Sequence, residues 1–175
     1  MTKNLLWLGC LFLALANGFA AQRGLPPREG IANFGKVSEM LYRGAQPDAV
    51  GITNLSKLGI KTIINLRMPK EVWKDEETAA RANGILYTNL PLRGLGRPMD
   101  RQVGEVLAII AASPFPVFVH CEFGCDRTGT VIACYRIKHQ RWPVESALQE
   151  ARRYGMSKWE RGMRRFILEF GKSNP

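Results

Sequence analysis

Histidine and cysteine are scarce in this sequence, which has two histidines and four cysteines among its 175 residues. Because His120 and His139 are the only imidazoles, we expect no histidine-based metal site, and no cysteine spacing is typical of a zinc finger. Basic residues are not interleaved with aromatic residues as in an RNA-binding signature, so nucleic acid is not an expected partner. The sequence also lacks internal repeats, and its length is typical of one globular domain with a normal core.

Long hydrophobic runs are missing as well, except for one near the N-terminus. Residues 5–16 are almost wholly apolar, Lys3 precedes them, and Gly18 and Ala20 are small residues. This pattern is typical of a secretory signal peptide, and the run is short for a membrane span. We therefore expect residues 1–20 to be a signal peptide cleaved near Ala20 and the protein to be exported, periplasmic or secreted. An uncleaved N-terminal anchor is the alternative.

Acidic residues are few in relation to basic ones, with 15 Asp and Glu against 25 Lys and Arg. Residues 1–20 contain one lysine and no acid, so their removal leaves 24 basic and 15 acidic residues and a net charge of +9. Such a charge attracts anionic partners, including phosphorylated substrates and lipid head groups. Arg161, Arg164 and Arg165 are expected to share the outer face of the last helix. That face is either solvated or in contact with an anionic membrane surface.

Three cysteines remain after removal of the leader, namely Cys121, Cys125 and Cys134. An odd number of cysteines does not make a disulfide framework in an oxidising compartment, so at least one thiol is expected to have a chemical role. Cys134 is interpreted as a core residue. Cys125 is either a packing residue or a redox partner of Cys121.

Downstream of residue 30, short apolar runs rich in β-branched residues alternate with segments of helical periodicity. Strands are predicted over residues 34–37, 40–43, 61–66, 85–90 and 116–120. Helices are predicted over residues 48–58, 75–83, 103–110 and 127–138, after Pro143, and at the C-terminal end, where the expected buried positions are Trp159, Met163, Phe166, Ile167 and Phe170. The alternation predicts an α/β fold, with a flexible segment at residues 21–30 and a single domain over residues 31–175 that has a largely parallel sheet.

The most informative segment is HCEFGCDRTG, residues 120–129, in which five residues separate Cys121 from Arg127. It lies between a predicted strand and a predicted helix. A turn at such a junction can point successive backbone N–H groups into one concavity, which binds a tetrahedral oxyanion beside the helix N-terminus. The same positive environment stabilises a thiolate, so Cys121 is expected to be nucleophilic near neutral pH.

Other residues of this segment fit the same chemistry. The planar fork of Arg127 can grip two phosphoryl oxygens at once, which a lysine cannot imitate. Gly124 allows the backbone to turn tightly. The Thr128 hydroxyl is expected to donate a hydrogen bond to the Cys121 sulfur and so to ease its later departure.

The segment resembles the signature H-C-x5-R-[S/T]-G of the protein-tyrosine phosphatase superfamily. Residues 33–47 and 64–67 also resemble compact bacterial dual-specificity-like phosphatases, and the likeness covers roughly residues 31–170. It implies a central, mostly parallel sheet of four or five strands flanked by helices, with the signature loop at the C-terminal edge. Residues 31–175 would then be a dual-specificity-like phosphatase domain that needs no metal and no cofactor.

Carried over residue by residue, the resemblance makes Cys121 the nucleophile, which forms a phosphocysteine, and Arg127 the phosphate clamp. The substrate-binding residues that it implies in the loop are Glu122, Phe123, Gly124, Cys125 and Thr128. Tyr42 and Arg43 are expected to organise the fold beneath this loop, and Arg67 is placed to reach the site from the end of a strand.

The general acid is the one part of the family pattern that is missing from its usual place. The family supplies an aspartate some thirty residues before the cysteine, but residues 89–96 contain no acid. Asp126, inside the loop, resembles the aspartate that precedes the arginine in myotubularin-type lipid phosphatases. Asp100 is the second candidate, although its position also suits a helix N-cap. A third alternative is that neither residue is the acid.

The expected activity is hydrolysis of phosphate monoesters on a phosphorylated protein or a small molecule, phosphotyrosine-like and extending to phosphoserine and phosphothreonine. None of residues 122–126 is basic and two are acidic, which favours monoesters over highly phosphorylated inositols. Three alternatives stay open: a phosphoinositide phosphatase, a catalytically weak phosphate-binding module, and a sulfur-transfer or arsenate-reducing enzyme.

Overall fold

Five short strands form one sheet in the order β1-β2-β5-β3-β4 in the computed structural model, which describes residue 27 and residues 30–174. The first pair of strands is antiparallel and the other three pairs are parallel. The predicted, mostly parallel sheet is therefore confirmed. The predicted signal peptide and nearly all of the segment at 21–30 lie outside the described residues. The strands are β1 (Gly35–Ser38), β2 (Leu41–Gly44), β3 (Thr62–Asn65), β4 (Leu86–Asn89) and β5 (Val117–His120).

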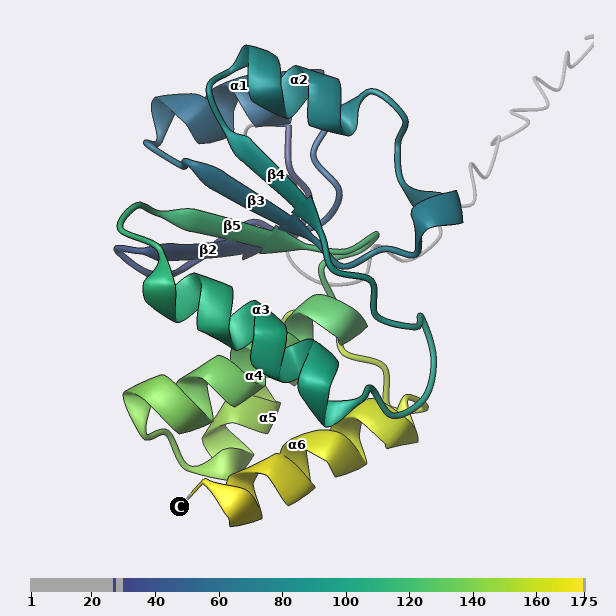
Figure 1. Ribbon diagram of the computed structural model, residues 1–175. Coiled ribbons are helices and arrows are strands. Elements are labelled where there is room, and N and C mark those ends of the chain that lie inside the picture. Colours follow the sequence, from purple (N-terminus) through teal and green to yellow (C-terminus); the bar gives the residue numbers. More distant parts are fainter. Residues whose placement is uncertain (1–26, 28–29, 175) are drawn as a thin grey trace, which may run out of the picture.

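Helices cover both faces of the sheet (Figure 1). Two of them, α1 (Ala49–Lys57) and α2 (Glu76–Ala82), lie on one face, and a short 3-10 helix, η1 (Pro69–Glu71), precedes α2. The remaining four form a thicker layer on the other face. They are α3 (Asp100–Ala112), α4 (Asp126–Gln140), α5 (Val144–Arg153) and α6 (Arg161–Ser173).

The central strand β5 is buried along its whole length. Side chains alternate across a strand, and here Val117 and Val119 join the core beneath α3 to α6, whereas Phe118 joins the core beneath α1 and α2. Apolar residues on both faces are what a strand covered by two helical layers requires. This arrangement fixes the position from which the chain leaves β5 and enters residues 121–125, the loop that the sequence predicts to bind phosphate and that is hereafter called the phosphate loop.

Two details of the helices differ from the sequence-based expectations. Trp159 is 74% exposed because α6 begins only at Arg161, so it does not belong to the buried face of the helix. Asp100 is the first residue of α3 rather than its cap, and the N-cap residue is Met99, whose N–H donates to the Gln102 side chain. The buried positions Met163, Phe166 and Ile167 are confirmed.

The three arginines of α6 do not share one outer face. Arg161 and Arg165 are exposed, and Arg165 pairs with Glu169 at 2.7 Å. Arg164 is only partly exposed and donates to the Lys158 carbonyl. Contact between α6 and an anionic membrane surface therefore stays a prediction, and it is supported by two exposed arginines, Arg161 and Arg165. Within residues 30–174, no helix is long and apolar enough to cross a membrane.

A buried pair of side chains ties the end of β5 to α2. His120 Nε2 lies 2.8 Å from Glu76 Oε1, and both side chains are fully buried. The other oxygen of Glu76 accepts a hydrogen bond from Asn65 at 2.7 Å. Burial alone would raise the pKa of Glu76, but the interactions with His120 and Asn65 outweigh it and hold this pKa below its ordinary value of 4.5.

This pair predicts a pH-dependent contribution to stability. A carboxyl whose pKa is lower in the folded than in the unfolded state stabilises the fold above the unfolded value, and the contribution is lost as the pH falls through the folded value. Glu76→Gln should lower the free energy of unfolding at pH 7 by about 1–3 kcal/mol. It should also flatten the decline of that free energy below about pH 4.5. Urea unfolding at a series of pH values measures both, and parallel pH curves for parent and variant would contradict the prediction.

Candidate active site

The phosphate loop joins the end of β5 to the start of α4, as the sequence predicts. Cys121 is its first residue and is almost fully buried. It lies against a cavity of about 240 Å³. The cavity is lined by the phosphate loop, the segment after β3 and the loop before α3, through Glu71, Gly94, Leu95, Cys121, Glu122, Phe123, Asp126 and Arg127.

Gly124 has the conformation that the tight turn requires. Its φ is +66°, in the region that favours glycine, and a Cβ at this position would lie 2.5 Å from the Gly44 carbonyl. The loop is therefore pressed against the end of β2, and the predicted need for glycine is confirmed.

Arg127 stands in the first turn of α4 and is almost fully buried. Its Nη1 donates to Glu71 Oε2 at 2.9 Å, while its Nη2 lies 3.9 Å from Glu122 Oε2. The hydrogen bond from Arg127 holds the pKa of Glu71 below its ordinary value. One edge of the guanidinium is thus fixed by a carboxylate within the cavity wall.

Sequence reasoning missed Glu71. A signal for it exists, because Glu71 follows β3, and the carboxyl ends of neighbouring parallel strands meet at the same edge of a sheet. The sequence analysis applies this reasoning to Arg67 alone. The structure does not place Arg67 in the cavity wall, and its side chain donates to Gln46 Oε1 at 3.3 Å instead.

The two aspartates considered as general acids lie in different places. Asp126 lines the cavity, and its Oδ1 accepts a hydrogen bond of 2.7 Å from the Ser157 N–H. Asp100 is exposed, pairs with Arg97 at 3.2 Å and is not part of the cavity wall. Of the two, only Asp126 is brought to the phosphate loop.

Three more residues of the signature were predicted to contact the substrate or the nucleophile. Glu122 and Phe123 line the cavity, as predicted. The Thr128 hydroxyl is buried and makes no hydrogen bond, so the expected bond to the Cys121 sulfur is not formed in this structure.

The other two cysteines lie outside the cavity wall. The Cys125 thiol donates to the Phe123 carbonyl at 3.2 Å. Cys134 is a core residue as predicted, and burial raises its pKa.

The site can hold a tetrahedral anion next to a thiol. Cys121 and Arg127 share one cavity at the N-terminus of α4, where backbone N–H groups favour an anion. Three carboxylates surround them, those of Glu71, Glu122 and Asp126. Cys121 and Cys134 are free thiols, and within the described part of the chain no cluster of side chains could hold a metal ion.

Comparison with known proteins decides the family. The protein-family model of the tyrosine phosphatase family matches residues 30–174. The chain belongs to the tyrosine phosphatase family. It is accordingly a cysteine-dependent phosphatase of the protein-tyrosine and dual-specificity type, as the signature at residues 120–129 predicts, and the family argues against the sulfur-transfer and arsenate-reducing alternatives.

Individual relatives agree with this membership. The dual specificity protein phosphatase TpbA of Pseudomonas aeruginosa is 31% identical over 168 residues, which cover 86% of this chain and 74% of the relative. The inositol diphosphatase DSP4 of Arabidopsis thaliana is 30% identical over 147 residues, covering 81% of this chain and 73% of the relative.

Solved structures give the same fold. The crystal structure of P. aeruginosa TpbA has a TM-score of 0.71 at 25% identity and covers 88% of this chain and 97% of its own. The catalytic core of the PP-IP phosphatase SIW14 from S. cerevisiae has a TM-score of 0.73 at 25% identity and covers 84% and 88%.

Proposed function

We propose that this phosphatase acts on phosphotyrosine-like monoesters, with Cys121 as nucleophile and Arg127 as phosphate clamp. The lining of the cavity carries the choice of substrate. Leu95 and Phe123 bring exposed apolar side chains to it, and Arg127 is the one cation among the described residues that line it. A phosphotyrosine has a single phosphate on an apolar ring, which matches one guanidinium beside two apolar side chains.

The carboxylates of the cavity support the same choice. Glu71, Glu122 and Asp126 add negative charge around a single phosphate-binding arginine. A polyphosphorylated inositol would bring further phosphates close to these carboxylates, and like charges at short range repel strongly where water is partly excluded. A substrate with one phosphate avoids this repulsion.

A second candidate activity rests on the relatives. Both an inositol diphosphatase and a PP-IP phosphatase are among the similar proteins, beside the dual specificity protein phosphatase TpbA. Hydrolysis of inositol phosphates is therefore the alternative, and the charge of the cavity is the observation that ranks it second. Phosphoserine and phosphothreonine fall within the same proposal as weaker substrates.

The mechanism that we propose has two displacements at phosphorus. The Cys121 thiolate attacks, so the S–P bond forms while the bond from phosphorus to the ester oxygen breaks, and Asp126 delivers a proton to the leaving oxygen. Arg127 holds two of the phosphoryl oxygens. Water then attacks the phosphocysteine, Asp126 takes its proton, and inorganic phosphate and the thiolate are released.

A substrate panel tests the function. The purified enzyme should hydrolyse a phosphotyrosyl peptide with a kcat/KM at least about tenfold above that for a polyphosphorylated inositol, a difference of about 1.4 kcal/mol in transition-state binding. Cys121→Ser should abolish turnover, and Arg127→Lys should lose roughly 10²-fold or more because the two-pronged grip is gone.

Cys134→Ala is the matched control for Cys121→Ser. It removes a thiol from the core beneath the sheet and should leave kcat/KM near that of the parent. Faster hydrolysis of the inositol than of the peptide would transfer the proposal to the second candidate. Turnover by Cys121→Ser would refute the mechanism.

The general acid is tested by varying the leaving group. Asp126→Asn should slow alkyl phosphates by about 10²–10⁴-fold, since a poor leaving group needs the proton. Activated aryl phosphates should change little. Glu71→Gln should instead slow both kinds equally, because it loosens Arg127, which acts on the phosphate whatever the leaving group. A selective loss on alkyl phosphates in Asp100→Asn or Glu71→Gln, rather than in Asp126→Asn, would move the acid to that residue.

Export of the enzyme is part of the proposal, and the N-terminal pattern of residues 1–20 supports it. In the native host, the mature protein should begin within a residue or two of Ala21 and should be recovered from the periplasm or the medium. N-terminal sequencing of the fractionated protein measures this. A cytoplasmic species that retains Lys3 is the result that excludes cleavage.

A further inference from the structure

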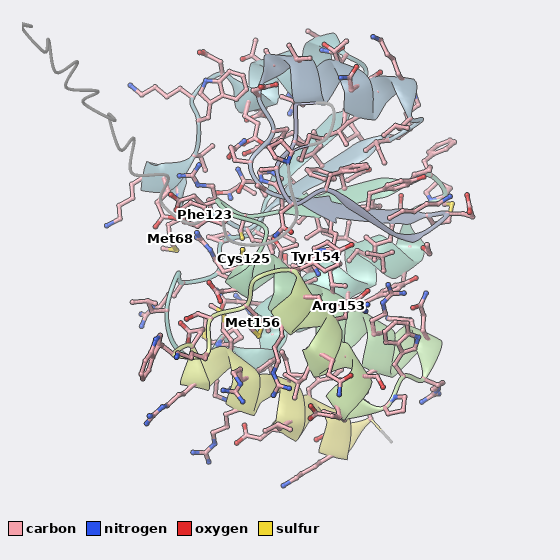
Figure 2. The ribbon with its side chains drawn as sticks, turned by 180° about the vertical axis from the view of Figure 1, so that it is seen from behind. Met68, Phe123, Cys125, Arg153, Tyr154 and Met156 are labelled. Atoms are coloured by element: carbon pink, nitrogen blue, oxygen red, sulfur yellow. The ribbon has the colours of Figure 1, made fainter. Side chains whose placement is uncertain are left out.

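The outer side of the phosphate loop is held by a segment that precedes it by about eighty residues. Three successive carbonyls of the loop each accept a hydrogen bond from this segment, at 3.1, 3.0 and 2.6 Å. The bonds join the Gln46 N–H to the carbonyl of Glu122, Asn33 Nδ2 to that of Phe123, and Arg43 Nη2 to that of Gly124. Figure 2 shows this side of the molecule, where Phe123, Cys125 and Tyr154 lie close together.

These bonds determine where the loop amides point. In a planar trans peptide the N–H points opposite to the carbonyl of the same unit. Carbonyls 122, 123 and 124 are drawn outward, so the N–H groups of the three residues that follow them are directed toward the inner side of the loop. That is the side on which Cys121 lines the cavity. The three bonds therefore aim the anion-binding amides.

Arg43 is the unusual member of the three. It stands on β2 and its side chain is fully buried, with the guanidinium carbon 3.8 Å from the centroid of the Tyr154 ring. Its Nη2 binds Gly124, but its Nε and Nη1 have no hydrogen-bond partner, and no described carboxylate lies within 4.0 Å of it. A buried charge that lacks some of its hydrogen bonds and an ion-pair partner lowers the free energy of unfolding.

The side chain nevertheless keeps its charge. Burial lowers the pKa of Arg43 to about 10, and nearby groups that include Tyr154, Glu150 and the thiol of Cys121 act in the opposite direction. The guanidinium is therefore a cation at neutral pH, with no carboxylate partner among the described residues, immediately behind the anion-binding loop. A buried cation without an ion pair costs folding free energy, so stability does not explain why Arg43 is there. An anion bound on the inner side of the loop would be attracted by this charge and explains it.

A second buried arginine shows the contrast. Arg136 donates to both oxygens of Glu150, at 2.8 and 2.6 Å, and also to the Val37 carbonyl. Its charge is fully compensated within the fold. Arg43 has no such carboxylate partner in the described part of the chain, although its side chain is buried at least as deeply.

We propose that Arg43 is a positioning residue for the phosphate site, which fixes the loop through the Gly124 carbonyl and adds a second positive charge behind it. The anion that it serves is the phosphoryl group held by Arg127 and the loop amides. Arg43 does not touch this group and acts through the loop. The inference rests on the proposed phosphatase site but not on the identity of the natural ester.

Tungstate binding tests the proposal without turnover. Tungstate is a tetrahedral oxyanion, so its Kd, measured by calorimetry, reports the anion site alone. Arg43→Met removes both the charge and the hydrogen bond and should weaken tungstate binding by roughly tenfold or more, less than the roughly 10²–10³ lost with a direct oxyanion donor. Arg43→Lys keeps the charge and should lie between Arg43→Met and the parent.

Arg136→Lys is the matched control, because it changes a buried arginine outside the site. It should lower the Tm without changing the Kd for tungstate. If Arg43→Met folds and binds tungstate within twofold of the parent, the proposal is overturned. If it does not fold, Arg43→Lys decides: an unchanged Kd with a lowered Tm means a structural role only, and a weakened Kd supports the proposal. Failure of the phosphotyrosyl substrate alone would leave this test unaffected.

Discussion

Everything in this site depends on the turn that the chain makes between β5 and α4. Within six residues the backbone must leave a buried strand, present a thiol and a set of amides to one cavity, and begin a helix. Gly124 makes the turn feasible, and its contact with Gly44 leaves no room for a side chain. The strand order serves the same site. Strands β2 and β3 flank β5 in parallel, so their carboxyl ends lie at the edge of the sheet where the loop begins.

The charges around the turn form two groups with different tasks. In the cavity, one arginine faces three carboxylates among the described lining residues, and this charge supports the proposed preference for substrates with little additional negative charge. Behind the loop, Arg43 is fully buried over the Tyr154 ring, and no carboxylate of the described residues forms an ion pair with it. The fold thus separates Arg127, which pairs with carboxylates inside the cavity, from Arg43, which lies behind the loop without an ion pair among the described residues.

Much of this could be predicted from the sequence, and the exceptions have a physical basis. The strands, the helices and the loop at residues 120–129 were accessible because periodicity and a contiguous motif are local signals. Glu71 was not, because its partner Arg127 lies 56 positions away and pairing at that distance leaves no local pattern. Trp159 was misplaced for a similar reason, since its apolar character matched the helical pattern although α6 begins after it.

The long-range bracing of the loop also bears on how the protein folds. The hydrogen bonds from Asn33 and Arg43 to the loop close sequence separations of 90 and 81 residues, and the bond from Asn33 to Tyr154 closes one of 121. Contacts of such separation carry a loop-closure entropy cost and form more slowly than local ones. A nascent chain that has already emerged with Cys121 and Arg127 still lacks Tyr154, whose carbonyl accepts a hydrogen bond from the same Asn33 side chain that binds the loop.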